Sequence, residues 1–310
     1  SGATNGWIPI EDDTVTDVPI KYNTEGIFGF GNDGSVCDIT NLVSNAGVVA
    51  ADVTGVGTAR SYPAACEYGG DKGIFAYGSG LTNVSNLVSN AGVVASDVTG
   101  VGTARNTLAA CSYGYDKGIF GYGSDAGGVA SMTNLVTNAG VVGTDVTGVG
   151  ADRYLLAACE YGGDKGIFGY GHDGNTTKYS ITNLVTNLGV VGSDVTGVGT
   201  ARYSLAACSY GYDKGIFGYG TVGGASGARS MTNLVSNTGV VASDVTGVGT
   251  ARRDVTATQY GGDKGIFGYG DTGDVSHTDA TNLVSNTGVV ATDVTGVGTA
   301  REGAAACSFN

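Results

Sequence analysis

Short stretches of apolar residues alternating with polar or small ones recur along the whole chain, and none has the spacing of a helix. One full unit contains four such stretches, at 204–210 (SLAACSY), 215–220 (GIFGYG), 231–236 (MTNLVS) and 239–245 (GVVASDV). A period of two indicates a β-strand, whereas an amphipathic helix spaces its apolar residues by three and four. Glycine and β-branched residues dominate the unit, which also favours strands. Each unit is therefore predicted to form four strands.

Glycine-rich segments separate these stretches and predict tight turns. The first pair of strands is joined by YGYDKG or YGGDKG, and the last pair by SNTG, SNAG or TNLG. Glycine, asparagine and aspartate are the residues that tight turns between antiparallel strands require. Consecutive strands of a unit are therefore expected to pair as neighbours in one antiparallel sheet.

The unit repeats six times, at intervals of 45 to 50 residues. Its first marker is the glycine of the GIF sequence, found at Gly26, Gly73, Gly118, Gly166, Gly215 and Gly265. Its second marker is the arginine that closes GVGTAR or a close variant, found at Arg60, Arg105, Arg153, Arg202, Arg252 and Arg301. Four short strands in a unit of this length are typical of one blade of a β-propeller.

The two ends of the repeat region complement each other. The first copy lacks a good first strand, while the chain ends on 304–309 (AAACSF), which matches the first strand of the other copies. A closed ring leaves no open sheet edge, so a unit split across the ends favours a ring over an open solenoid. The predicted fold is all-β: a six-bladed β-propeller of four-stranded antiparallel blades, closed by the C-terminal strand joining the N-terminal blade. The propeller spans 22–310, with 22–57 and 301–310 forming blade 1, and 1–21 is expected to be an extended arm.

The order of segments in the unit resembles a kelch repeat. A small residue and an arginine precede the first strand, a glycine-bearing apolar strand follows, and two further strands complete the unit, across residues 22–310. The tandem, almost identical units are also similar to repeat arrays of bacteriophage structural proteins. The kelch resemblance implies a propeller that engages partners through the face that carries the loops between the second and third strands.

Charge and cysteine content narrow the classes of partner. The formal net charge is −13, with 15 lysines and arginines against 28 acids. This balance argues against nucleic acid and anionic membrane surfaces, and no apolar run reaches the ~18 residues of a membrane span. Five of the six cysteines fall at one repeat position, and we expect small buried hydrophobes there rather than disulfides or a zinc site. Free thiols fit assembly in a reducing cytosol.

The repeat arginines and aspartates are expected to be structural. The arginines are predicted to tie neighbouring blades together, and the aspartates of the DVTG segments to cap turns. In contrast, two short windows differ between copies: the loop between the second and third strands, and the residues directly after the arginine. In an up-and-down blade both windows emerge on one face, and loops on a rigid scaffold are the usual place for binding. Acidic residues outnumber basic ones in these windows.

We therefore predict a variable, acidic binding face. Its candidate residues are Tyr62, Asn106, Asp125, Tyr154, His172, Asp173, Lys178, Tyr179, Tyr203, Arg229, Arg253, Asp271, Asp274, His277 and Glu302. The tyrosines offer amphipathic contacts suited to protein interfaces or sugars. The alternative is that these loops vary because nothing constrains them.

The sequence carries no recognisable catalytic constellation. Its two histidines are too few for a three-histidine copper or zinc site, and neither a GxSxG elbow nor a P-loop is present. Short acidic stretches such as NDG, HDGN and DTGD offer oxygen ligands for Ca²⁺, but none is a full loop motif, so no cofactor is expected. Carboxylates of the acidic face, such as Asp173 and Asp271, leave a glycoside hydrolase as an alternative function.

The expected function is non-enzymatic. The chain is predicted to display its variable acidic face to a protein or a glycan, as a virion or tail component or at an extracellular surface, with residues 1–21 attaching it to a larger assembly. A purely structural decoration without a ligand is the remaining alternative. Neither nucleic acid nor membrane insertion is expected.

Overall fold

The computed structural model describes residues 23–310 except 225, 274 and 275. The expected arm at 1–21 and the candidate Asp274 therefore lie outside the described residues. The described chain contains strands, turns and bends, and no helix long and apolar enough to span a membrane is found in it.

Six antiparallel three-stranded sheets make up this part of the chain, each with its second strand in the middle. The sheets are β20 (Ala305–Phe309), β1 (Glu25–Asn32) and β2 (Val36–Val43); β3 (Ala64–Tyr68), β4 (Lys72–Ala76) and β5 (Ser85–Val88); β6 (Ala109–Tyr113), β7 (Lys117–Gly121) and β10 (Thr133–Val136); β11 (Ala157–Tyr161), β12 (Lys165–Gly169) and β13 (Thr182–Val185); β14 (Ala206–Tyr210), β15 (Lys214–Gly218) and β16 (Thr232–Val235); and β17 (Thr256–Tyr260), β18 (Lys264–Gly268) and β19 (Thr281–Val284). A small ribbon pairs β8 (Ser124–Asp125) with β9 (Gly128–Val129).

The ends of the described chain meet in one sheet. β20 pairs antiparallel with β1, with Cys307 opposite Ile27. The backbone N–H of Thr24 donates to the carbonyl of Asn310 at 3.2 Å, which extends this pairing beyond the strands. The sheet of the first unit is thus completed by the last strand of the chain.

The prediction that the fourth segment of each unit forms a continuous strand is wrong. In the fifth unit this segment makes only isolated bridges, Val235 with Val241 and Thr232 with Val245. Between the bridges the outer segment holds one residue more than β16, which is the geometry of a β-bulge. The side chain of Asn233 fills the interrupted ladder: its Nδ2 donates to the carbonyl of Ala242 at 3.0 Å. The other units carry equivalent pairs of bridges.

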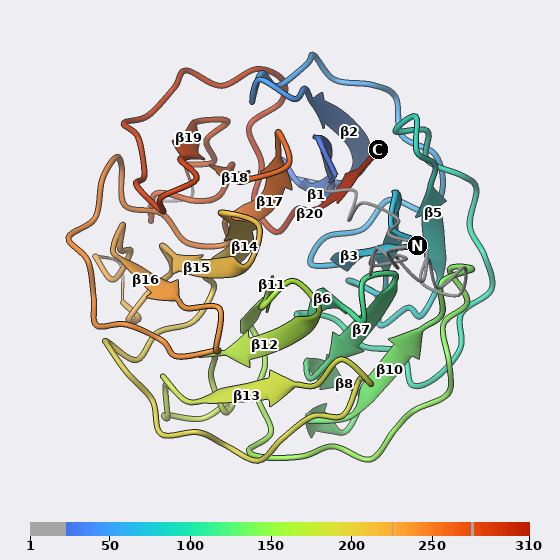
Figure 1. Cartoon of the computed structure of the whole chain (residues 1–310). Coiled ribbons are helices and arrows are strands. Elements are labelled where there is room, and N and C mark those ends of the chain that lie inside the picture. Colours follow the sequence, from blue (N-terminus) through green and yellow to red (C-terminus); the bar gives the residue numbers. More distant parts are fainter. Residues whose placement is uncertain (1–22, 225, 274–275) are drawn as a thin grey trace, which may run out of the picture.

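The six sheets are arranged around a common centre, with their first strands nearest to it (Figure 1). β3 contacts β6, β6 contacts β11, β11 contacts β14, β14 contacts β17, β17 contacts β20, and β20 contacts β3. Each first strand therefore has one neighbour on either side from the adjoining sheets.

Small residues let neighbouring sheets approach closely. A Cβ atom at Gly166 would lie 2.5 Å from Cys111 Sγ of the preceding sheet, and one at Gly169 would lie 2.8 Å from the ring of Phe217 in the next sheet. The Phe217 ring also packs edge-on against Tyr170, with centroids 5.1 Å apart. The five repeat cysteines are buried and form no disulfide, as predicted, and Cys37 is half-buried and free.

A buried arginine connects each sheet to the preceding one. The Cζ atom of Arg202 lies 4.4 Å from the ring centroid of Tyr170, which follows β12, and its guanidinium donates to Asn233 Oδ1 in β16 at 2.8 Å. Asn233 in turn donates to Asp244, which also accepts from the hydroxyl of Thr200 at 2.6 Å. All six repeat arginines are fully buried and stack in this way, over Phe30, Tyr77, Tyr122, Tyr170, Tyr219 and Tyr269. The prediction that they tie neighbouring units together is confirmed.

Replacing Arg202 with methionine is expected to lower the free energy of unfolding by about 3–5 kcal/mol. The change leaves Asn233 Oδ1 and the Tyr219 carbonyl without their buried donor. The matched control is Thr200→Ala, which copies the residue found naturally at Ala151 and should lose only about 1 kcal/mol. Urea unfolding measures both variants, and equal losses would contradict the role given to the arginine.

The repeat thiols are expected to resist modification in the folded protein. Burial raises the pKa of Cys208 to about 12 and moves the pKa of the other four repeat thiols in the same direction. The thiolate is the reactive form, so a thiol reagent at pH 8 should label at most Cys37. Unfolding in guanidinium should release all six. Rapid labelling of more than one thiol without denaturant would refute this packing.

Candidate functional site

Six residues, one from each unit, form a circle of backbone hydrogen bonds. We call them the mouth residues: Tyr62, Thr107, Leu155, Ser204, Asp254 and Gly303. The N–H of each donates to the carbonyl of the mouth residue of the preceding unit, at 2.7 to 3.2 Å. The bond from Tyr62 to Gly303 completes the circle. Neighbouring units are therefore held in a fixed register at this end of the first strands.

All six mouth residues have left-handed backbone conformations, with φ between +52° and +57°. This region favours glycine, yet only Gly303 is one. A Cβ atom at Gly303 would lie 3.0 Å from the ring of Tyr62, so the glycine here makes room for that ring. The other five positions hold side chains in a conformation that such residues rarely adopt.

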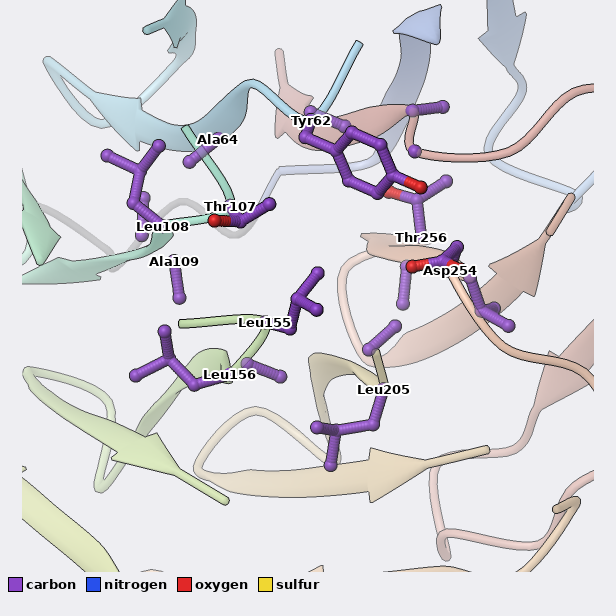
Figure 2. A pocket seen from close by; sticks show the side chains of 18 of the residues that line it. Tyr62, Ala64, Thr107, Leu108, Ala109, Leu155, Leu156, Leu205, Asp254 and Thr256 are labelled. Carbon is purple, nitrogen blue, oxygen red and sulfur yellow. The ribbon is translucent and has the colours of Figure 1, made fainter. Parts of the chain in front are cut away.

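The mouth residues surround a cavity of about 130 Å³. Below them its lining includes alanines of the first strands, such as Ala109, and the residues directly before those strands, such as Leu156. Figure 2 shows Thr107 and Leu155 pointing into this mouth cavity, and the hydroxyl of Tyr62 on the same side as Asp254. The lining thus mixes aliphatic side chains with polar groups, and Tyr62, Ser204 and Asp254 form one polar side of it.

Charged side chains gather beside this polar side of the mouth. Arg253 donates to Asp271 through Nη2 at 2.8 Å and Nε at 3.2 Å, and its Nε lies 3.8 Å from Asp254. The hydroxyl of Tyr62 donates to Glu302. The structure thus brings four of the predicted residues, Tyr62, Arg253, Asp271 and Glu302, together with Asp254. His277, a fifth, lies 4.0 Å from Glu302.

The pKa values of two of these carboxyl groups are shifted in opposite directions. Burial, with a further contribution from Glu302, raises the pKa of Asp254 to about 7, although a hydrogen bond from Ser204 opposes the shift. Burial acts on Asp271 too, but hydrogen bonds from the Gly273 N–H and from Arg253 outweigh it and lower its pKa. Asp254 therefore holds the carboxyl that can gain or lose a proton near neutral pH.

A second group of predicted residues forms an aromatic cluster between the fourth and fifth units. The ring of His172 lies 5.7 Å from that of Tyr154 and 5.0 Å from that of Tyr203. His172 Nδ1 accepts a hydrogen bond from the Gly174 N–H at 2.9 Å, so its proton is on Nε2. Lys178 pairs with His172 through a backbone bridge.

Both variable windows meet at these sites. Isolated bridges join Asn106 to Ser124, Tyr154 to His172, Tyr203 to Thr221 and Arg253 to Asp271, and each pairs a residue after the arginine with the loop that follows the second strand. The remaining predicted residues lie apart from the two groups. Asp125 caps the Gly127 N–H, Arg229 donates to two carbonyls of its own loop, and Tyr179 is half-buried.

The two acids named for the hydrolase alternative, Asp173 and Asp271, both have lowered pKa values. Asp173 accepts hydrogen bonds from the backbone N–H groups of Asn175 and Thr177, and its pKa is lowered. The pKa of Asp271 is lowered as well, so neither group is poised as the general acid that glycoside hydrolysis needs. Within the described ranges, no group of three or more His, Cys, Asp or Glu residues is placed to hold a metal ion.

A second, smaller cavity of about 50 Å³ lies beyond the alanines and contains acids that the sequence analysis missed. It is lined by Glu67, Ser112, Glu160, Ser209 and Gln259, which occupy the position after the repeat cysteine. Burial raises the pKa of Glu67 to about 7, and burial together with the charge of Glu67 raises that of Glu160. Comparing the six copies in the sequence shows that Glu and Ser alternate at this position. It does not show the direction in which their side chains point.

No protein-family model matches the chain, and a search of curated proteins finds no match either. The candidate site therefore stands on the geometry of these residues.

The free energy of unfolding is expected to fall as the pH rises from 5 to 8. Carboxyl groups with raised pKa values bind protons more tightly in the folded state than in the unfolded state. Their stabilisation is fully present below the ordinary pKa of 4.5 and is lost as the pH passes the folded pKa of about 7. The aspartates with lowered pKa values, such as Asp244, act only at lower pH, because their stabilisation is lost as the pH falls below their ordinary range.

Thermal unfolding between pH 5 and 8 tests this dependence. In the double variant Glu67→Gln, Glu160→Gln the melting temperature should fall less steeply with pH than in the wild type. Asp254→Asn should remove part of the remaining slope. Parallel profiles for all proteins would show that these three carboxyl groups do not titrate as described.

Proposed function

We propose that the six sheets are the blades of a six-bladed, kelch-like propeller, and that its variable face recognises a protein or a glycan without catalysing a reaction. The cyclic order of contacts among the first strands supports the propeller, as does the circle of mouth hydrogen bonds. The opposite turns add a second series: the Gly69 N–H donates to the carbonyl of Asp116, and so on from unit to unit until Asn310 donates to Asp71.

The observation that carries the recognition proposal is the diversity of the mouth residues at one strained conformation. A left-handed backbone disfavours a residue with a side chain by about 1–2 kcal/mol. Glycine would relieve this strain, yet five of the six mouth positions keep different side chains. Strain of this kind is characteristic of functional sites, where the surrounding structure compensates for it.

The tyrosines of the GYG segments make an informative contrast. They too have left-handed backbones, with φ of +60° to +66° at Tyr77, Tyr122, Tyr170, Tyr219 and Tyr269. These positions are almost uniform because each ring stacks on a buried arginine. The mouth residues share no such packing partner, so a common structural role does not explain why side chains are retained there.

The scaffold suits a display function. The side-chain contacts that join the sheets use residues that are the same in nearly every unit, whereas the variable window after the arginine joins neighbouring units through backbone groups. Near-identical tandem units are also a property that the chain shares with repeat arrays of bacteriophage structural proteins. We therefore propose a virion or tail component, attached to a larger body through residues 1–21, with the variable face turned outward.

A glycine-mouth variant tests the recognition proposal. Thr107, Leu155, Ser204 and Asp254 are replaced by glycine, the residue that the chain itself uses at Gly303. Because relief of the left-handed strain offsets the flexibility of glycine, each change should alter stability by only about 1 kcal/mol. The variant should fold but lose binding in a screen against a glycan array and host-cell surfaces.

The matched control is Tyr115→Gly. Tyr115 also has a left-handed φ, of +68°, and it is exposed at the opposite end of β6, where other units carry glycine. This control should bind like the native protein. Equal binding by the native protein and the glycine-mouth variant would place recognition outside the mouth, and no binding by the native protein would favour a structural decoration.

A further inference from the structure

The mouth cavity presents one carboxyl group in an otherwise uncharged lining. Of the residues that line it, Asp254 alone carries a carboxyl, and its side chain is only 9% exposed. Opposite it stand the side chain of Leu155 and the methyl-bearing Thr107, with alanines below. A cavity lined by aliphatic side chains and uncharged polar groups, with one acid at its side, suits a ligand that has an aliphatic stem and a cationic head.

The carboxyl groups on the Asp254 side of the mouth outnumber the basic side chains beside them. The guanidinium of Arg253 uses two donors on Asp271 and contacts Asp254 only at 3.8 Å. Glu302 is a third carboxyl, beside the hydroxyl of Tyr62. One fixed cation therefore faces three carboxyl groups, and the net charge of −13 on the whole chain adds to the attraction of a positive group.

We propose that the mouth cavity binds a lysine side chain from a protein partner, with its ammonium group at Asp254 and its stem between Leu155 and the ring of Tyr62. This assignment rests on the proposed recognition function and names its partner chemistry. A volume of about 130 Å³ corresponds to about four waters at ~30 Å³ each, which is the size of a side chain of a few heavy atoms.

The geometry favours lysine over arginine. Asp254 lies beside the hydroxyl of Ser204 and 3.8 Å from the Nε of Arg253, so its two oxygens are not both open to the planar fork of a guanidinium. The compact ammonium group has three donors that can be shared between a carboxylate oxygen and the hydroxyl oxygens of Tyr62 and Ser204. Its flexible four-carbon stem is apolar and can pack against the aliphatic side chains of the lining.

Binding should depend on the protonation of Asp254. The groups around this carboxyl are Ser204 from the neighbouring unit, Arg253 and Asp271 from its own unit, and Glu302 and Tyr62 from the units that follow, with His277 beyond Glu302. Since the pKa of Asp254 is about 7, only a minor fraction is ionised at pH 6 and most is ionised at pH 8. An ammonium ligand needs the ionised form, so its apparent affinity should rise about tenfold between these pH values.

The test is a calorimetric titration of the full chain with Nα-acetyl-lysine amide, a lysine side chain on a neutral backbone. We expect binding at pH 8 that is about tenfold weaker at pH 6, and no binding of Nα-acetyl-norleucine amide, which has the stem without the charge. Asp254→Asn should weaken binding at pH 8 at least tenfold. Asp125→Asn removes an acid from the same face outside the cavity and should change nothing.

A second variant covers the case in which Asp254→Asn does not fold. Leu155→Trp keeps the carboxyl but fills the cavity, and it should also abolish binding. Undiminished binding by either folded variant, equal binding of norleucine amide, or no binding of lysine amide by the native protein overturns the assignment. If the native chain still requires its mouth residues in the glycan and cell-surface screen, recognition stands and only the lysine assignment fails. If that screen fails too, both are wrong.

Discussion

The stacking of a buried guanidinium between neighbouring sheets is the interaction on which the rest of this structure depends. A sheet of three strands, each of about five residues, buries too little to be stable alone. The repeat arginine joins two such sheets, because its planar face covers an aromatic ring of one while its donors reach an asparagine of the next. Burial lowers the pKa of Arg60 to about 10, which still leaves its guanidinium charged at neutral pH.

This contact also explains why variation is confined to one part of each unit. The arginine needs a ring on one side and an asparagine on the other, and the sheets need small residues such as Gly166 and Gly169 where they touch. These positions are nearly the same in every unit, with Ala76 at the position of Gly169 and Phe30 in place of a tyrosine as the departures. The mouth residues instead hold their neighbours through backbone groups, so their side chains can differ while the circle of hydrogen bonds stays the same.

The two cavities place ionisable groups in different surroundings. Asp254 lies at the mouth, beside an arginine and two further carboxyl groups, with its side chain 9% exposed. Glu67 and Glu160 lie deeper, beyond the alanines, among serines and cysteines. Burial raises the pKa in both places, but the mouth cavity is the larger of the two, at about 130 Å³ against about 50 Å³.

The sequence by itself determined the strand-rich unit, its six copies, the pairing partner of the last strand and the roles of the arginines and cysteines. Each of these follows from period, turn residues and side-chain size, which are local properties. It did not determine the β-bulge in the fourth segment, the left-handed backbone conformation of the mouth residues or the direction in which the Glu67 side chain points. At the mouth, residues such as Thr107 and Leu155 disfavour the conformation that they adopt. Hydrogen bonds from neighbouring units impose it, and those exist only once the tertiary structure has formed.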